Sequence, residues 1–243
     1  EFYSNFLAEN NWDDKRANNR RIRQSKYAED LKNNPVDVDV VPIKSVNSKY
    51  PEYRPKVNAE ENIMYFTSRR TGGSSEILDD EGKYYEDIYY SEKKHNVWTD
   101  PILVQDLINT QQNSSCLFLS PDAQMMYLSM VNNDPKIGNI GRGIYESKLD
   151  GSHWTEPSFL EEKINSKFWE TYASLDIYGN ILLFVSDREG GYGGRDIWMV
   201  KKLPSGEWAD PQNLGEPINS EYDEESPYLH PDGKTLYFSS KGH

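Results

Sequence analysis

The residues that could carry chemistry in this chain are few and scattered. The single cysteine, Cys116, has no second cysteine to pair with, and the four histidines fall in separate expected loops and turns. Neither residue type has the ligand spacing of a metal site, and no Gly-x-Ser-x-Gly sequence marks a nucleophilic serine. The sequence therefore predicts no catalytic, cofactor-binding or metal-binding residue, and Cys116 is expected to be a small buried side chain in a strand. The histidines are His95, His153, His230 and His243.

A glycine-rich run at residues 190–194 suggests anion binding, because exposed backbone N–H groups can bind a phosphate. A phosphate loop is followed by a helix and usually carries a lysine, whereas Asp196-Ile197-Trp198 continues as an expected strand. We interpret the run as a loop that needs positive φ angles and close packing. Asp187, Asp196 and the run Asp223-Glu224-Glu225 could bind a cation, but solvated loops are the expected explanation.

These residues belong to a repeat that returns four times. Three tryptophans each stand three residues before a proline, and each proline stands eight residues before an asparagine. Each repeat asparagine stands 18 residues before an apolar position, and the interval after that position is the one that varies. Fixed spacing with one variable loop is typical of stacked supersecondary units. The tryptophans are Trp98, Trp154 and Trp208, and the pairs are Asn47 with Tyr65, Asn109 with Tyr127, Asn165 with Leu183, and Asn219 with Tyr237.

Each repeat is expected to contain four short strands. The first strand runs into a turn such as His230-Pro231-Asp232-Gly233, and the second, such as Leu182-Leu183-Phe184, is apolar on both faces and must be covered on both sides. The third contains Ile88, Ile144 or Ile197, and the fourth follows the tryptophan. Four strands every 54 to 62 residues predict an all-β fold, a β-propeller of four-stranded blades. The first strands are expected to end at Val57, Leu119, Leu175 and Leu229.

The start of the chain has a different pattern. Residues 1–34 contain no Gly or Pro and carry apolar residues at roughly helical steps, which predicts one or two amphipathic helices ending before Pro35. Residues 36–43 alternate apolar with acidic residues and are expected to form a strand that closes the ring as the fourth strand of the last blade.

The expected domains are therefore an α-helical segment and a propeller of about three and a half blades. Because three and a half blades cannot close a ring, we expect a longer protein with at least one and a half further blades. The helical segment covers 1–34, the propeller 35–243, and the blades about 44–104, 105–160, 161–215 and 216–243.

The formal charge of −13 argues against nucleic acid or an anionic membrane surface as the main partner, because both require a basic surface. No apolar stretch is long enough to span a membrane. Residues 15–26 are nevertheless basic, and we expect them to form a solvated face or to pair with acidic neighbours rather than to form a docking site.

Residues that recur in every copy are expected to serve the framework, whereas a functional site should break the repeat. Trp98, Trp154 and Trp208 are therefore interpreted as packing between blades and not as a carbohydrate platform. The better candidates lie in the variable loops 69–86, 130–142 and 187–195. No role is assigned to any of their nonrepeated residues, which include Arg69, Arg70, Tyr84, Tyr85, Lys136, Arg142 and Tyr192.

Residues 230–240, His-Pro-Asp-Gly-Lys-Thr-Leu-Tyr-Phe-Ser-Ser, resemble the repeat of TolB-like, WD-type propellers. The first copy, Asn58-Ala59-Glu60-Glu61-Asn62, departs from that pattern because it lacks Pro and Gly. Together with the glycine-rich run, the Asn-Ser and Trp-x-x-Pro elements are similar to propellers of OmpA-family envelope proteins. That resemblance covers residues 36–243. It implies tetratricopeptide helices before the propeller, and a carboxypeptidase-regulatory-like domain and a peptidoglycan-binding domain after it; the family includes a component of type IX secretion machinery.

The resemblance implies a noncatalytic scaffold of a cell-envelope complex, periplasmic and associated with the outer membrane. Its loops and helical arm would bind other envelope or outer-membrane proteins, and domains outside this chain would bind peptidoglycan. The alternative is a propeller module of a hydrolase, either one that gates a peptidase or one that acts on glycosides. A Ser-Asp-His hydrolase domain in the intact protein would favour that alternative.

Overall fold

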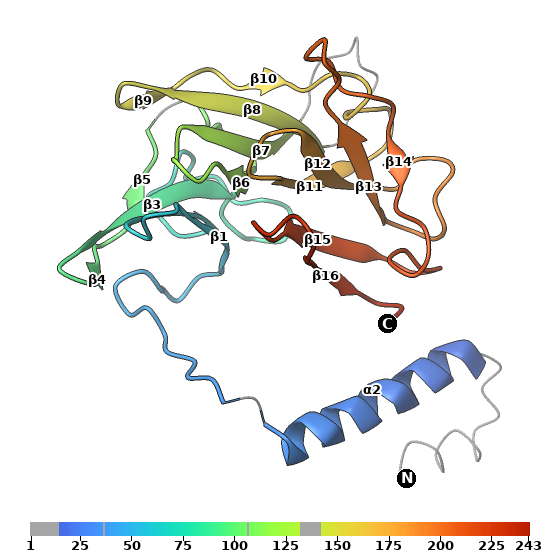
Figure 1. Cartoon of the computed structure of the whole chain (residues 1–243). Helices are drawn as coiled ribbons and strands as arrows, with labels where there is room; N and C mark the ends of the chain where they lie inside the picture. The colour runs from blue at the N-terminus through green and yellow to red at the C-terminus, as the bar shows by residue number, and fades with distance from the viewer. Residues whose placement is uncertain (1–14, 36, 106, 132–141) are drawn as a thin grey trace. The chain divides into compact units, whose positions relative to one another are not determined.

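The structure, a computed structural model, describes residues 15–35, 37–105, 107–131 and 142–243 (Figure 1). The chain divides into two compact units, residues 1–42 with 242–243, and Ile43–Lys241. Helix α2, Lys15–Asn33, is the regular element described in the first unit and confirms a helix there; the rest of the predicted helical segment lies outside the described residues. Among the residues described, no helix is long and apolar enough to cross a membrane.

The second unit consists of four successive antiparallel sheets, which we call blades 1 to 4. Blade 1 contains β1 (Glu52–Val57), β2 (Ile63–Ser68), β3 (Asp87–Lys94), β4 (Val97–Trp98) and β5 (Ile102–Leu103). Blade 2 contains β6 (Ser114–Leu119), β7 (Met125–Val131), β8 (Arg142–Asp150), β9 (His153–Trp154) and β10 (Ser158–Phe159). Blade 3 contains β11 (Glu170–Leu175), β12 (Ile181–Ser186), β13 (Asp196–Lys201) and β14 (Gln212–Asn213). Blade 4 contains β15 (Glu224–Leu229) and β16 (Leu236–Ser240).

The strand pattern predicted from the repeat is confirmed. The four first strands end at the four predicted residues, and each pairs with an apolar second strand that pairs in turn, in blades 1 to 3, with a third. The fourth strand is shorter than expected. At each tryptophan the chain pairs with the end of the third strand of its blade. After a short unpaired stretch it pairs with the third strand again, as the two-residue strands β5, β10 and β14.

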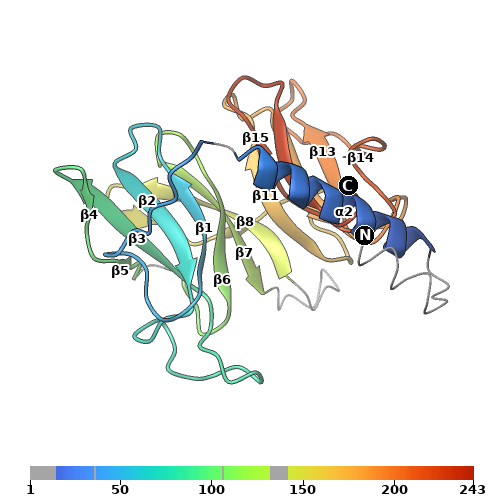
Figure 2. The ribbon, with the colours of Figure 1, turned by 90° about the horizontal axis from the view of Figure 1, so that it is seen from below.

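The first strands lie innermost, and β1, β6, β11 and β15 contact one another in that order (Figure 2). The core lies between the blades. Trp154 of blade 2 meets the Tyr65 ring of blade 1 edge-on, with ring centroids 5.6 Å apart, and Trp208 joins a buried cluster that includes Tyr127. The predicted packing between blades is thus confirmed for Trp154 and Trp208, whereas Trp98 is half-buried and packs against residues of blade 1.

The repeated asparagines have a structural role that the sequence did not reveal. In Asn165, Oδ1 accepts from the Ile144 N–H at 2.8 Å, and Nδ2 donates to the carbonyl oxygens of Ile144 at 2.8 Å and Leu160 at 3.0 Å. Asn109 bonds its preceding blade in the same way, and Asn219 does so except that its Nδ2 donates to the Asn213 side chain in place of the second carbonyl. One amide side chain thus ties the third strand of a blade to the connection that leads to the next blade.

The prediction for residues 36–43 is wrong for the part that is described. Residues 37–43 form no strand, and the side chains of Val38, Val40 and Val41 are exposed. An alternating apolar and acidic segment becomes a strand when a sheet edge pairs with its backbone, and no such pairing is found for residues 37–43. The neighbouring Asn47 is also exposed, whereas Asn165 and Asn219 are buried and Asn109 is half-buried.

The turn of the first copy has the geometry of the others despite its different sequence. Asn58 Oδ1 accepts hydrogen bonds from the N–H groups of Asn62 and Ile63, each at 3.0 Å. Asp176 does the same in blade 3, where it accepts from the N–H groups of Asn180 and Ile181. The two turns therefore share an oxygen-bearing side chain at this position, and Glu61 adopts a positive φ, 53°, as Gly179 does in blade 3.

Candidate functional site: the central cavity

The innermost strands each contain a β-bulge at the same level. The ladder register shifts between Tyr53 and Lys56 in β1 and at the matching places in β6, β11 and β15. In three blades the bulge residue has a positive φ angle, 55° in Arg54, 51° in Tyr172 and 56° in Ser226. A non-glycine residue in this region has a strained backbone. The bulges therefore reorient the side chains of these residues at a cost in backbone strain energy.

The side chains seven and nine residues after each repeat asparagine, at the bulge or next to it, differ from blade to blade. At seven residues after the repeat asparagine, the chain has Arg54, Cys116, Tyr172 and Ser226. At nine residues after it, the chain has Lys56, Phe118, Ser174 and Tyr228. The second strands beside them are uniformly apolar. By the criterion that a site breaks the repeat, the innermost strands are the place to look.

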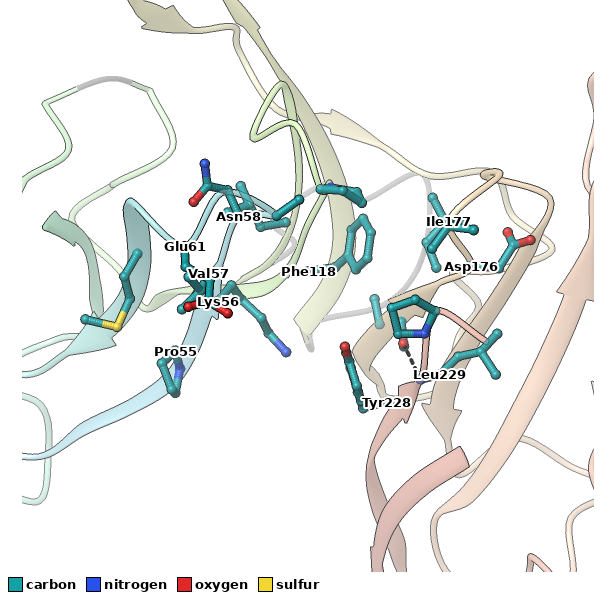
Figure 3. A pocket seen from close by; sticks show the side chains of 18 of the residues that line it. Pro55, Lys56, Val57, Asn58, Glu61, Phe118, Asp176, Ile177, Tyr228 and Leu229 are labelled. Carbon is teal, nitrogen blue, oxygen red and sulfur yellow. Dashed lines mark hydrogen bonds between the residues drawn. The ribbon is translucent and has the colours of Figure 1, made fainter. Parts of the chain in front are cut away.

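Residues from all four innermost strands line a cavity of about 930 Å³, a volume within the range of ligand sites. Lys56, Phe118 and Tyr228 point toward it from three different blades (Figure 3). A second cavity of about 580 Å³ shares Lys56 and Tyr228 with the first and adds Arg54 and Tyr172. We call the two together the central cavity.

Three described cations lie in the wall of the central cavity: Lys93, whose Nζ lies over the Trp98 ring, and the neighbouring pair Arg54 and Lys56. Burial lowers the pKa of Lys56, Cys116 opposes that shift, and the nearby charge of Arg54 adds to it. The Arg54 guanidinium lies 4.7 Å from the centre of the Tyr172 ring, and its Nη1 is buried without a hydrogen-bond partner. No described carboxylate forms a hydrogen bond or an ion pair with Arg54 or Lys56.

Cys116 lies fully buried in β6, as predicted. Burial raises the pKa of its thiol to about 12, although Lys56 and Arg54 oppose that shift. The thiol is therefore protonated at neutral pH and is a poor nucleophile. His230 lies in the exposed turn of blade 4, where its Nδ1 accepts from the Asp232 N–H at 3.2 Å. No group of three His, Cys, Asp or Glu residues in the described chain is arranged to hold a metal ion.

The variable-loop arginines predicted as candidates are used inside the molecule. Glu86, buried where loop 69–86 ends, accepts from Arg142 Nη2 and Tyr53 Oη, each at 2.6 Å, and pairs with Arg69 Nη2 at 3.4 Å. Burial raises the pKa of Glu86, but Arg142, Tyr53 and Ser115 outweigh it and lower the value to about 2. The same contact with Glu86 and burial raise the pKa of Tyr53. The Glu86 cluster therefore joins blades 1 and 2.

Arg70 was taken as a nonrepeated residue, and that interpretation is wrong. Arg70 Nη2 binds Glu52 at 3.0 Å, and Arg188 Nη2 binds Glu170 at 3.1 Å in the corresponding place of blade 3. Both guanidinium groups also lie over aromatic rings of their own blades. The spacing of 18 residues between glutamate and arginine, seen in both copies, could have revealed the pair.

The acidic residues interpreted as solvated loops are also placed differently. Asp196 and Glu224 begin strands β13 and β15 and are 1% and 0% exposed. Glu224 accepts from the hydroxyl groups of Ser220 and Ser240, at 2.5 and 2.6 Å, and Asp223 pairs with Arg195. They are buried because they occupy repeat positions at strand starts. Asp187 is exposed and accepts from the Trp169 N–H.

The remaining candidates are not brought together. Tyr84 is half-buried with its ring edge-on to Tyr50, Tyr85 is half-buried, and Tyr192 is exposed. Lys136 lies outside the described residues. The run at 190–194 packs closely, as predicted, because a Cβ on Gly193 would lie 2.5 Å from the Ser220 carbonyl oxygen. Sequence reasoning missed Arg54 and Lys56, although their nonrepeated positions after Asn47 were a usable signal.

Comparison with protein-family models gives no match, and none is found among curated proteins. Among solved structures, TolB from Acinetobacter baumannii aligns with a TM-score of 0.53 and 16% identity, over 80% of this chain and 39% of that one. A putative TolB from Agrobacterium tumefaciens aligns with a TM-score of 0.47 and 14% identity, over 79% and 71% of the two chains. An alpha-L-arabinofuranosidase from Lactobacillus brevis gives 0.48 and 13%, over 79% and 66%.

The likeness to the first of these structures shows the fold and nothing about activity, and this chain spans 39% of its length. It agrees with the four successive antiparallel sheets and with their innermost first strands. The described chain is an all-β protein with the fold of a TolB-like β-propeller, preceded by one helix.

Proposed function

We propose that the chain is a noncatalytic protein-binding module whose binding site is the central cavity. The observation that carries the proposal is the contrast between framework and cavity. Arg142 with Glu86, and the tryptophans Trp154 and Trp208, hold neighbouring blades together. The cavity wall instead presents a different side chain from each blade.

The chemistry of the cavity wall supports binding rather than catalysis. Phe118, Tyr228 and Leu229 supply apolar and aromatic surface, and Tyr228 is 47% exposed. Aromatic side chains of this kind often contribute most of the energy of protein interfaces. The Cys116 thiol beside the wall is protonated at neutral pH and does not supply a nucleophile.

On the resemblance of its repeat motifs to OmpA-family propellers, the intact protein would belong to a periplasmic complex that is associated with the outer membrane. Peptidoglycan attachment would come from domains outside this chain, and type IX secretion is one setting in which such a protein would work. The partners would be other envelope or outer-membrane proteins, with the cavity, in place of the variable loops, as the main contact.

The test is to isolate the intact protein from cell envelopes, identify the protein that accompanies it, and measure the affinity of the purified pair. Tyr228→Ala is expected to weaken binding about thirtyfold, the effect of losing a hot-spot aromatic residue. Tyr178→Ala, at a 77% exposed turn position, is the matched control and should leave affinity unchanged. Equal affinities for both variants, or peptide or glycoside hydrolysis that depends on this chain, would contradict the proposal.

A further inference from the structure

The arginines of the propeller divide into two kinds. Within Ile43–Lys241, five arginines form an ion pair with a carboxylate, at distances that run from 2.6 to 3.1 Å for the shortest contact of each. Arg54 is the sixth, and it has no such pair although Nη1 is buried. The paired arginines are Arg69, Arg70, Arg142, Arg188 and Arg195.

Lys56 repeats this situation two residues later on the same strand. It lines both parts of the central cavity, and Arg54 lines the smaller part with it. Pro55 between them has no backbone N–H and sits in the bulge, where the ladder is interrupted. Two like charges are thus held close together in a partly desolvated wall, although the chain as a whole carries a charge of −13.

The acidic residues near the cavity do not neutralise this pair. Asp176 lines the cavity, but its Oδ1 accepts from two backbone N–H groups of its own turn. Glu61 lines the cavity from an exposed turn. Neither residue contributes to the electrostatic shift of Lys56, which comes from Arg54 and Cys116. A buried cation without a counterion is costly, so an anion supplied from outside would be bound favourably here.

The rest of the wall indicates what carries that anion. The Tyr172 ring lies against Arg54, and Phe118 and Tyr228 face the same space. The larger part of the cavity, about 930 Å³, is lined mainly by apolar side chains and is reached by Lys56, whereas Arg54 faces the smaller part. This combination fits a carboxylate attached to apolar groups. A guanidinium and an ammonium group also supply donors suited to a carboxylate.

We propose that Arg54 and Lys56 bind the carboxylate of an Asp or Glu side chain in a partner protein, with apolar neighbours of that residue on Phe118 and Tyr228. This inference rests on the proposed function, because it names the chemistry of the segment that the central cavity accepts. It also explains why a strained arginine is placed at the bulge of β1, where the other blades have uncharged residues.

The test uses the intact protein and two end-blocked tripeptides, Phe-Asp-Leu and its isostere Phe-Asn-Leu, with binding followed by NMR titration. The Asp peptide should bind at least about tenfold more tightly, and the double variant Arg54→Met, Lys56→Met should remove the difference. Lys201→Met, on the exposed end of β13, is the control and should leave it intact. Equal binding of the two peptides, or no binding of either, overturns the inference.

A second measurement needs no ligand. If Lys56 lacks a counterion, Lys56→Met removes an uncompensated charge and should leave the melting temperature unchanged or raise it by a few degrees. A drop of several degrees would mean that Lys56 is already paired, which would also overturn the inference. If a partner protein binds the double variant as tightly as wild type, the scaffold proposal stands and the carboxylate assignment fails. If the Asp peptide binds as expected but Tyr228→Ala leaves partner affinity unchanged, the carboxylate assignment stands and the scaffold proposal fails.

Discussion

A single residue type explains the repeat that dominates the sequence. The asparagine of each copy was visible as a spacing marker, and the structure shows why it is needed. In Asn165 one buried amide binds the Ile144 N–H and the Leu160 carbonyl, and it adds a second hydrogen bond to the Ile144 carbonyl, which also accepts from the Leu160 N–H. Unpaired buried polar groups are costly, so this position tolerates few alternatives.

Asn165→Ala is therefore expected to lower the free energy of unfolding by roughly 2–4 kcal/mol, because it leaves buried backbone groups without partners. Asn47→Ala is the matched control, since Asn47 has the same repeat position but is exposed, and its change should stay within about 0.5 kcal/mol. Urea denaturation of both variants measures the difference. Similar losses at the two positions would show that the amide does not act by tying blades together.

Glu86 makes a prediction about acid stability. Its pKa is about 2 in the folded protein and 4.5 ordinarily, so the folded state favours the ionised form. The stabilisation is complete above pH 4.5 and is lost as pH falls toward 2, with a total of about 3 kcal/mol.

Wild type should accordingly be more stable than Glu86→Gln at pH 7, and the gap should close as the carboxylate becomes protonated. Thermal denaturation of both proteins from pH 7 to pH 2.5 provides the measurement. A gap that stays constant over this range would show that Glu86 is not held ionised by Arg142 and Tyr53.

At the scale of strands and loops, the strands could be located from the sequence because their ends recur at the same positions in every copy of the repeat. The first strands end where predicted, and the second strands are apolar for the predicted reason. The bulges were not predicted, since a register shift depends on how two paired backbones fit and leaves no fixed residue type. Residues 37–43 were assigned a strand from alternation alone, but a strand also needs a partner, and alternation does not reveal one.

The candidate site was harder to predict than the fold. The sequence analysis looked for function at nonrepeated residues of the variable loops, where insertions made them obvious. Arg69 and Arg142 proved to be partners of buried Glu86. Lys56 was overlooked because a nonrepeated residue inside a constant-length strand is recognised only when the copies are aligned position by position.

The variable loop of blade 3 packs so tightly on the start of blade 4 that it should not accept a methyl group. In Gly193→Ala the new Cβ would meet the Ser220 carbonyl oxygen and the Glu221 backbone at 2.5 Å, so a loss of about 1–3 kcal/mol is expected. Gly82→Ala meets no atom within 4 Å but has a φ of 75°, and should cost about 1 kcal/mol through backbone strain. Chemical denaturation measures the free energy of unfolding of both variants. A neutral Gly193→Ala would mean that the loop moves aside without affecting blade 4.

For the molecule as a whole, repetition and function occupy different places. The repeated residues build the framework: tryptophans and asparagines join a blade to its neighbour, and glutamate–arginine pairs recur at fixed positions within a blade. The innermost strands keep their backbone pairing but vary the side chains that face the central cavity. This arrangement lets the cavity change without loss of the framework, and it makes the cavity, in preference to the loops, the expected binding site.

The most direct test of this account compares two tyrosines of similar exposure, Tyr228 in the cavity wall at 47% and Tyr192 in a variable loop at 54%. Each is replaced in turn by a photoreactive phenylalanine analogue in the intact protein, and crosslinks to partner proteins are measured in cell envelopes. The account predicts strong crosslinking from position 228 and little from position 192. Strong crosslinking from position 192 with none from position 228 would contradict it.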